Sequence, residues 1–213
     1  MTPDLRPGAR ALAPFVAAMA AVVVLSNVLV QFPVEAMLGG VNLADTLTWG
    51  AFTYPVAFLV TDLANRHLGP RAARWVVLVG FLIAVVLSIA LASPRIAIAS
   101  GTAFLVAQLL DVGVFDRLRH GRWWRAPLVS SAIGSVVDTL LFFAIAFAPL
   151  FGALDLGGED ASLGFAVPLL GVGPAEVPLW VSLALGDLVV KMLVALALLA
   201  PYGALRGRDA APA

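Results

Sequence analysis

The 213-residue chain contains no cysteine and only two histidines, and Asp, Glu, Lys and Arg together make up just 12% of it. The absence of cysteine excludes disulfides and thiolate metal sites. Both histidines, His67 and His120, stand among arginines at the ends of apolar stretches, which leaves little for histidine-based catalysis. Because a soluble domain carries about a quarter charged residues, this composition excludes an ordinary water-soluble domain.

Long apolar stretches take up most of the remaining sequence. Hydrophobic residues make up 62% of the chain, and the mean hydropathy is +1.01. A transmembrane helix needs about 20 mostly apolar residues, and six stretches qualify. We therefore expect an all-α polytopic membrane protein in which residues 1–213 form a single domain, a bundle of six transmembrane helices. The expected spans are residues 11–30, 47–65, 75–92, 96–115, 126–150 and 177–202.

Several local features refine these spans. Residues 18–20 (AMA) are similar to a signal-peptide cleavage site, but the apolar stretch continues well past them, which favours an uncleaved span. Pro55 inside the second span, and the Ser-Pro-Arg turn at residues 93–95, indicate broken helices whose freed backbone groups could serve a polar site. Residues 152–176 are rich in glycine and proline and are typical of an external loop, with a partly buried piece around residues 165–170.

Arginine is distributed unevenly between the two expected sides of the membrane. One side holds Arg6, Arg10, Arg66, Arg71, Arg74, Arg117, Arg119, Arg122, Arg125, Arg206 and Arg208. The other side holds Arg95 with Glu35, Asp45, Asp155, Glu159, Asp160 and Glu176. The positive-inside rule then predicts that both termini are cytoplasmic. The basic, tryptophan-containing residues 117–125 could suggest nucleic-acid binding, but a cytoplasmic loop with interfacial tryptophans is the better interpretation, and we expect no nucleic-acid partner.

Ionisable residues inside the expected spans are the main indication of function. They are Asp62, Asp111, Asp138, Asp187 and Lys191. Each costs about 2.5–3.5 kcal/mol at a helix centre, so an intramembrane charge marks a functional site by default. Asp138 and Asp187 should lie near mid-membrane, about 18 and 15 Å deep at a rise of 1.5 Å per residue. The other three lie one or more turns nearer the cytoplasm, and Asn27 marks the outer half of the first span.

Helical spacing assigns two of these groups to polar faces. Asp187 and Lys191 are four residues apart with the acid first, the favourable order for an ion pair, although the pair could serve only to neutralise itself. Two serines at helical spacing precede Asp138, and Phe142 follows it at the same spacing. Asp138 makes this polar stripe informative, because no cation lies three or four residues away on its own helix.

The remaining carboxylates have competing interpretations. Gln108 and Asp111 share one face of the fourth span, but Asp111 could instead pair with an arginine of the following loop, Arg117 or Arg119. Asp62 could be a ligand residue or an interfacial partner of Arg66, its neighbour four residues on. Asp116 points away from Asp111 and is expected to pair with arginines at the interface.

A shared polar interior would suit a particular kind of ligand. If Asp138, Asp111, Gln108 and the Asp187–Lys191 pair converge, they supply acceptors, an amide and a cation beside aromatic faces. A small, flat heterocycle fits such a pocket, because a carboxylate accepts two parallel N–H bonds from an amidine-like edge. Mid-depth carboxylates would also suit proton coupling.

Two other classes of protein fit the residues less well. An intramembrane aspartyl protease needs a GxGD motif, and the residues before Asp187 lack its first glycine. The spans contain no histidine for a Ser–His hydrolase, and no glycine-rich phosphate motif precedes a helix start. We therefore expect no enzyme. An assembly scaffold would not readily explain a carboxylate as deep as Asp138.

Five stretches of the chain resemble one known family. They are SNVLVQFPVE (26–35), LTWGAFTYPVAFLVTDLANRHLG (47–69), AQLLDVGVFDRLR (107–119), WWRAPLVSSAIGSVVDTLLFFAIAF (123–147) and DLVVKMLVALALLAPYG (187–203). Together they are similar to the bacterial queuosine-precursor transporters, which belong to the broader vitamin-uptake transporters. The resemblance covers most of residues 26–203 and is weakest in the third span and in the loop at 152–176.

The resemblance implies uptake of 7-deazaguanine compounds, 7-cyano-7-deazaguanine or 7-aminomethyl-7-deazaguanine, across a bacterial plasma membrane, which is the inner membrane in a Gram-negative cell. These compounds are precursors of the tRNA nucleoside queuosine. The family matches fall on Asp62, Gln108, Asp111, Asp138, Asp187 and Lys191, and Asn27 and Phe142 complete the candidate substrate site. We expect Asp138 or Asp111 to bind the amidine edge, with Gln108 beside it.

Some aspects stay open at the level of sequence. No cofactor is expected, and the partners are the small-molecule substrate and the lipid bilayer. The sequence leaves open whether the chain forms a homo-oligomer, and whether it works with an energising partner as the membrane subunits of ECF transporters do. The alternative function is an uptake transporter, or a substrate-binding membrane subunit, for another vitamin or purine-like compound.

Overall fold

The molecule is almost entirely helical, and the computed structural model describes residues 8–156 and 160–207. The α-helices are α1 (Ala9–Leu29), α2 (Gly50–Thr53), α3 (Val56–Leu68), α4 (Pro70–Leu91), α5 (Pro94–Leu118), α6 (Arg125–Phe147) and α7 (Leu179–Leu205). Short 3-10 helices cover Leu43–Asp45, Pro149–Leu154 and Leu169–Gly171. Two small antiparallel hairpins pair β1 (Met37–Leu38) with β2 (Val41–Asn42), and β3 (Ala166–Pro168) with β4 (Glu176–Pro178).

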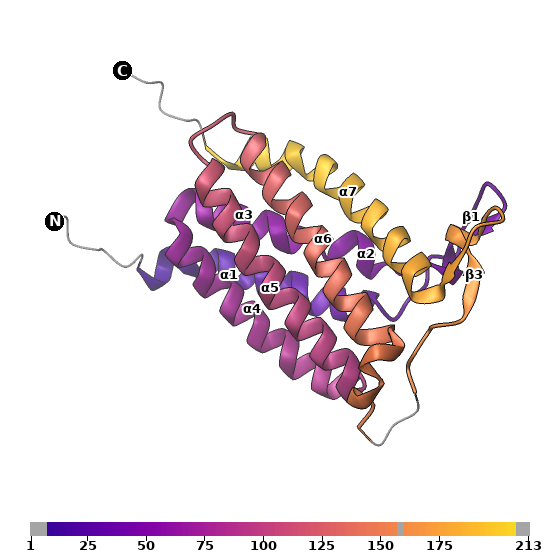
Figure 1. Cartoon of the computed structure of the whole chain (residues 1–213). Helices are drawn as coiled ribbons and strands as arrows, with labels where there is room; N and C mark the ends of the chain where they lie inside the picture. The colour runs from indigo at the N-terminus through magenta and orange to yellow at the C-terminus, as the bar shows by residue number, and fades with distance from the viewer. Residues whose placement is uncertain (1–7, 157–159, 208–213) are drawn as a thin grey trace.

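Five helices, α1 and α4 to α7, are long and apolar enough to cross a membrane. They have 21 to 27 residues each and lie side by side in one bundle, with both hairpins near the same end (Figure 1). They coincide with five of the six expected spans, and their ends differ from the expected ones by a few residues. The expectation of an all-α polytopic membrane protein is therefore confirmed.

The second expected span is a pair of helices. α2 has 4 residues and α3 has 13, and Tyr54 and Pro55 join them. Pro55 has no backbone N–H and cannot continue the helix from α2, so the chain begins a new helix after it, and the expected break is confirmed. α2 also packs tightly on the end of α1, because a Cβ at Gly50 would lie 3.0 Å from Val30.

Compact turns explain why α4 and α5 begin earlier than expected. α3 ends at Gly69, whose φ of 86° lies in the left-handed region that favours glycine. Pro70 then starts α4 at once, since proline is well suited to the first helical position. At the opposite end of α4, Ser93 caps α5 by accepting a hydrogen bond from the backbone N–H of Ile96. Arg95 therefore lies in the first turn of α5.

Among the described residues, every arginine except Arg95 lies at one end of the bundle. The start of α1, the α3–α4 turn, the α5–α6 loop and the end of α7 all lie at this end (Figure 1). Arg66 donates to the backbone carbonyl of Arg119 at 2.8 Å, and Arg119 pairs with Asp116 at 3.3 Å. The expected interfacial role of Asp116 is confirmed. Arg6, Arg208 and Glu159 lie outside the described residues.

Arg95 is buried at the opposite end, with 0% of the residue exposed. Its guanidinium donates to the backbone carbonyls of Ile145 and Ala148, where α6 ends, and to the Asp155 carboxylate at 2.8 Å. Asp160 lies 3.7 Å away. The sequence placed Arg95 in the short turn between the third and fourth spans, and the structure shows that its side chain joins the start of α5 to the end of α6 and to the segment beyond it.

The connection between α6 and α7 folds back over the bundle. Its β3–β4 hairpin precedes α7 directly, and Leu170, whose φ is 53°, donates its backbone N–H to the Ser182 hydroxyl at 2.8 Å. Leu170 is half-buried, whereas Phe165 is 58% exposed. The expected partly buried piece is therefore present around Leu170 and does not include Phe165.

Glycine allows two pairs of helices to approach closely. A Cβ at Gly80 of α4 would lie 2.6 Å from the Met19 side chain of α1. A Cβ at Gly134 of α6 would lie 2.6 Å from the Phe58 ring of α3. Small residues at such crossings are how membrane helices gain packing contacts. The first contact holds α1 against α4, and the second holds α3 against α6, two helices that carry polar groups described next.

Candidate functional site

A cavity of about 390 Å³ lies in the half of the bundle away from the arginines. It is enclosed by α1, α2 and α4 to α7, together with residues 44–48 before α2. Its polar and aromatic lining includes Ser26, Asn27, Gln31, Asp45, Thr46, Thr48, Tyr54, Ser88, Ser100, Phe104, Asp138, Phe142, Phe143, Phe147, Asp187 and Lys191. A volume in this range is typical of sites for small organic molecules.

Three charged side chains from α6 and α7 meet at the cavity wall. The Lys191 Nζ donates to the Asp138 carboxylate at 2.7 Å and lies 2.6 Å from the Asp187 carboxylate. Thr139 links the group, because its hydroxyl accepts from Lys191 at 3.1 Å and donates to Asp187 at 2.8 Å. Two carboxylates share one ammonium, so the triad Asp138–Lys191–Asp187 carries net negative charge when all three are ionised.

The triad is held in a partly enclosed position. The side chains of Lys191 and Asp138 are 5% and 4% exposed, and that of Asp187 is 13% exposed. The Tyr54 ring lies 5.4 Å from Lys191 Nζ, a distance at which the ring face attracts a cation. Tyr54 occupies this position because the chain breaks its helix immediately before Pro55.

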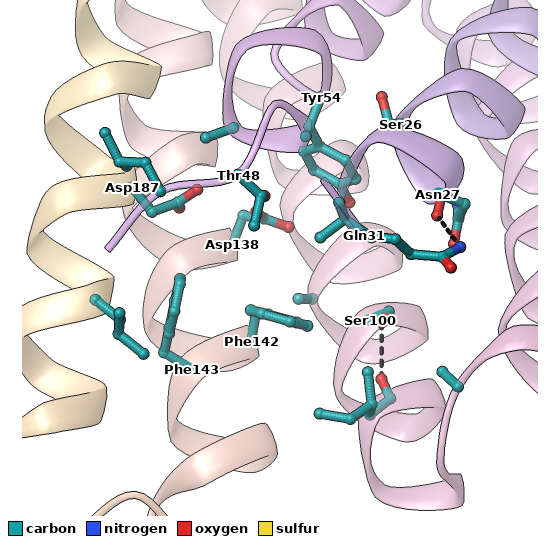
Figure 2. Close-up of a pocket in the computed structure, with 18 of the residues that line it drawn as sticks. Ser26, Asn27, Gln31, Thr48, Tyr54, Ser100, Asp138, Phe142, Phe143 and Asp187 are labelled. Carbon is teal, nitrogen blue, oxygen red and sulfur yellow. Dashed lines mark hydrogen bonds between the residues drawn. The ribbon is translucent and has the colours of Figure 1, made fainter. Parts of the chain in front are cut away.

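Aromatic and amide groups form the facing walls. Phe142 contacts Phe143 edge-on at 5.1 Å between ring centroids, and both line the cavity below Asp138 and Asp187 in Figure 2. Asn27 and Gln31 lie on the opposite side, on and just after α1 (Figure 2). Asn27 donates its amide N–H to the backbone carbonyl of Val23 at 2.9 Å, which fixes the side chain beside the cavity.

The structure divides the predicted site into two groups. Asp138, Asp187, Lys191, Asn27 and Phe142 line the cavity. Gln108, Asp111 and Asp62 are absent from its lining and are buried deeper, toward the arginine-rich end. The expected convergence of all these residues on one pocket is therefore wrong. Depth separates them, because Asp138 lies two helical turns beyond the serines of α6 that contact Asp62.

The deeper group has contacts of its own. The Thr61 hydroxyl donates to the Gln108 side-chain carbonyl at 2.6 Å. Asp62 accepts from Ser130 at 3.2 Å and from Ser131 at 3.3 Å. Asp62 is 1% exposed and is held by these two serines of α6, so it lies in the buried interior of the bundle.

The structure also decides the alternative interpretation of Asp111, a salt bridge to an arginine of the following loop. It is 0% exposed, and within residues 8–156 and 160–207 neither of its oxygens has a hydrogen-bond donor. Arg119 pairs with Asp116 instead. The salt bridge from Asp111 to Arg117 or Arg119 that the sequence left open is therefore not formed.

Sequence reasoning overlooked Tyr54 and Thr139 as parts of the cavity region. Tyr54 could have been found from its position before Pro55, since a helix break directs nearby groups into a bundle. Thr139 directly follows Asp138 and carried no separate signal. In the part of the chain that the structure describes, no cluster of three His, Asp or Glu residues could hold a metal ion.

Comparison with known proteins adds independent evidence. The model of the family described as "putative vitamin uptake transporter" matches residues 48–93 and 87–205. The queuosine precursor transporter of Escherichia coli (strain K12) is 40% identical over 147 residues, which cover 59% of this chain and 64% of the relative. The probable queuosine precursor transporter of Haemophilus influenzae is 38% identical over 153 residues, covering 59% and 65%.

A more distant relative matches a longer stretch. The probable queuosine precursor transporter of Bacillus subtilis is 26% identical over 185 residues, covering 74% of this chain and 70% of the relative. The matched part spans less than two thirds of the length of the Escherichia coli and Haemophilus influenzae proteins. No solved structure matches the chain.

Apolar helices surrounding a charged, solute-sized cavity define an all-α polytopic membrane protein of the transporter class. Within that class, the chain belongs to the family of putative vitamin uptake transporters, whose model matches most of its length.

Proposed function

We propose that this protein imports a queuosine precursor, 7-cyano-7-deazaguanine or 7-aminomethyl-7-deazaguanine, and that the cavity is the substrate site. One observation carries the proposal: the triad Asp138–Lys191–Asp187 lies at the wall of a cavity of about 390 Å³. The names of the Escherichia coli, Haemophilus influenzae and Bacillus subtilis relatives support the same substrate class. We propose a carrier without catalytic activity.

The chemistry of the triad suits a guanine-like ring. The N1–H and 2-amino groups of such a ring donate two parallel hydrogen bonds, which a carboxylate accepts. We assign this edge to Asp138, because Asp187 already accepts from both Lys191 and Thr139 through one oxygen. Phe142 offers a face for stacking. Asp111, which the sequence offered as the alternative to Asp138, does not line the cavity.

The net charge of the triad also suits the aminomethyl compound. Its ammonium group adds one positive charge, and the triad has one carboxylate more than it has cations. Asn27 and Gln31 add polar contacts from the facing wall. The 7-cyano compound lacks this charge, so the aminomethyl form should be the stronger competitor in a binding experiment.

Complementation tests the function directly. The gene is expressed in a bacterium that requires queuosine precursors and lacks its own transporter, and queuosine in tRNA is measured after either precursor is supplied. Import restores the modification in proportion to the amount of protein in the membrane. Unmodified tRNA despite normal membrane levels would overturn the proposal.

A second candidate is uptake of another vitamin or purine-like compound on the same scaffold. The description of the matching family favours it, since that description covers vitamin uptake in general. Competition decides between the two: labelled precursor uptake is measured with an excess of guanine, adenine or unrelated vitamins. Displacement by an unrelated vitamin, but by neither deazaguanine, would favour the second candidate.

We further propose that the arginine-rich end faces the cytoplasm of a bacterial cell, in the inner membrane of a Gram-negative one. α2 and α3 together would then form a sixth crossing, and both termini would be cytoplasmic. Arg66 and Arg119, which bind each other's backbone, would hold two cytoplasmic turns together. Reporter fusions that are active on only one side of the membrane test this orientation at each terminus.

A further inference from the structure

Two aspartates lie side by side below the substrate cavity without forming part of it. Asp62 of α3 is 1% exposed, and Asp111 of α5 is 0% exposed. Two hydrogen bonds join α3 to α5 on either side of the pair: Thr61 donates to Gln108, and Asn65 donates to the backbone carbonyl of Val112. Ser130 and Ser131 of α6 lie against Asp62, and both serine hydroxyls donate to its carboxylate.

The donors available to this pair are too few for two ionised carboxylates. Neither Asp111 oxygen has a donor among the residues that the structure describes, and the nearby Ser130 hydroxyl donates to Asp62 and to the Pro127 carbonyl. In the same residues, no lysine or arginine forms an ion pair with Asp62 or Asp111. Two adjacent carboxylates in an apolar interior cannot both stay ionised. One proton shared between them makes an O–H···O⁻ bond and supplies the donor that Asp111 lacks.

The surrounding ionisable groups leave this pair isolated. On the cavity side, Lys191 is held by Asp138 and Asp187. On the arginine side, Tyr202 of α7 is the titratable residue that lines the same narrow cleft as Asp62. α1 and α4 contribute apolar side chains such as Met19, Val23, Val76 and Val77 to the same core.

Polar groups connect the pair to both ends of the bundle. Ser135, three residues before Asp138 and four after Ser131, is fully buried, and its hydroxyl has no partner within the described ranges. It therefore lies on α6 between the cavity and the pair. In the other direction, Asp62, Ser131 and Tyr202 line a narrow cleft between α3, α6 and α7.

We propose that Asp62 and Asp111 form the proton-carrying site of this transporter. One proton, taken up from the cavity side, is held between the two carboxyl groups and is released toward the arginine-rich end when that side becomes hydrated. Substrate binds separately in the cavity, so one proton and one substrate molecule move inward together. The inference rests on the proposed function, because it supplies the driving ion for that transport.

Transport by the purified full-length protein in proteoliposomes tests the proposal. Two rates are compared for labelled 7-aminomethyl-7-deazaguanine: accumulation driven by an imposed pH gradient, and exchange against unlabelled substrate without a gradient. Asp62→Asn and Asp111→Asn should lose gradient-driven accumulation and retain exchange, because exchange needs no net proton movement. Asp116→Asn is the matched control: it is the same change on α5, at a half-exposed interfacial residue, and it should retain both.

Three results would overturn the proton site. One is gradient-driven accumulation at the wild-type rate in Asp62→Asn and Asp111→Asn. Another is accumulation that follows a sodium gradient and ignores pH, which would make the pair a sodium site. The third is loss of exchange together with accumulation in both aspartate variants at normal membrane levels, which would place the pair in substrate binding.

Infrared spectroscopy without substrate separates this inference from the proposed function. The carboxylic-acid C=O band of the wild-type protein should lose intensity in Asp111→Asn and stay unchanged in Asp116→Asn. If the wild-type protein shows no exchange of either deazaguanine, the proposed function fails, while the infrared band still reports the shared proton. If the asparagine variants do not fold, Asp111→Glu should retain the band and proton-driven accumulation. A wild-type spectrum with no such band would overturn the inference.

Discussion

Lys191 of α7 donates to the carboxylate of Asp138 on α6 at 2.7 Å, so an aspartate without a cation on its own helix has its counter-ion on the neighbouring one. The opposite directions of these two helices favour the contact. Each Cα–Cβ bond tilts toward the start of its helix, so the Asp138 side chain leans toward the arginine-rich end of the bundle and the Lys191 side chain leans toward the opposite end. The charged ends of Asp138 and Lys191 therefore meet at one depth in the bundle, although their Cα atoms lie at different depths.

The first prediction concerns the charge of Asp138. Asp138→Asn removes the carboxylate and cannot accept two parallel N–H bonds, so uptake should fall sharply while the amount of protein in the membrane stays near normal. Labelled-precursor uptake and membrane immunoblots measure the two quantities. Full uptake by this variant would show that the carboxylate is not needed. Asp116→Asn, on the arginine-rich surface, serves as the control and should behave like the wild type.

The second prediction separates charge balance from ligand binding in the triad. Lys191→Met leaves two adjacent carboxylates without their cation and should lower the free energy of unfolding by about 3–5 kcal/mol. Asp187→Asn should lower the free energy of unfolding by about 1 kcal/mol, because Lys191 keeps its ion pair with Asp138 and the Asp187 side chain is 13% exposed. Thermal unfolding of the purified protein in detergent gives both values. Equal losses would contradict the shared-cation arrangement.

The double variant Asp187→Leu with Lys191→Met tests the same triad by transport. If the two residues only neutralised each other, their joint replacement by apolar groups would be tolerated. Because both line the cavity, we expect transport to be lost at normal membrane levels. Transport close to wild type would assign the pair a purely structural role.

The fourth prediction concerns two helical glycines with different surroundings. Gly134→Ala should destabilise the protein by about 1–3 kcal/mol, because the new methyl group would lie 2.6 Å from the Phe58 ring. At Gly113 no atom lies within 4 Å of an added Cβ. Gly113→Ala should therefore be neutral or stabilise the helix by up to about 1 kcal/mol. Thermal unfolding of the two variants gives the comparison, and an equal effect would contradict the close α3–α6 packing.

The fifth prediction concerns Arg95. Arg95→Met removes the guanidinium that donates to the Asp155 carboxylate and to the Ile145 carbonyl at the end of α6, and should cost about 3–5 kcal/mol of unfolding free energy. Adding Asp155→Leu removes the stranded charge and should restore part of the loss. Thermal unfolding of the single and double variants forms the measurement. A double variant less stable than Arg95→Met would show that Asp155 has another role.

Much of the bundle follows from the sequence because membrane insertion imposes simple rules. Apolar length predicts α1 and α4 to α7, and Pro55 predicts the break between α2 and α3. The collection of arginines at one end also follows from charge alone. The fold of the chain around Leu170 and the burial of Arg95 depend on contacts between distant segments, which hydropathy does not report.

The site was harder to predict than the spans. Helical spacing identifies which residues share a face, as with Asp187 and Lys191, but it does not say which neighbouring helix that face meets. Gln108 and Asp111 were therefore expected beside Asp138, whereas Gln108 accepts from Thr61 of α3 and neither residue lines the cavity. Thr139 became significant only when Lys191 and Asp187 were placed next to it.

α6 runs without interruption from Arg125 to Phe147 and carries Asp138 at the cavity as well as Ser130 and Ser131 against Asp62. A rigid rotation of this one helix would turn Asp138 away from the cavity and, in the same movement, withdraw both hydroxyls from Asp62. The contacts of Asp138 at the cavity and those of Asp62 would then change together, because both depend on one rigid helix. No chain of intermediate side chains would be needed to couple them.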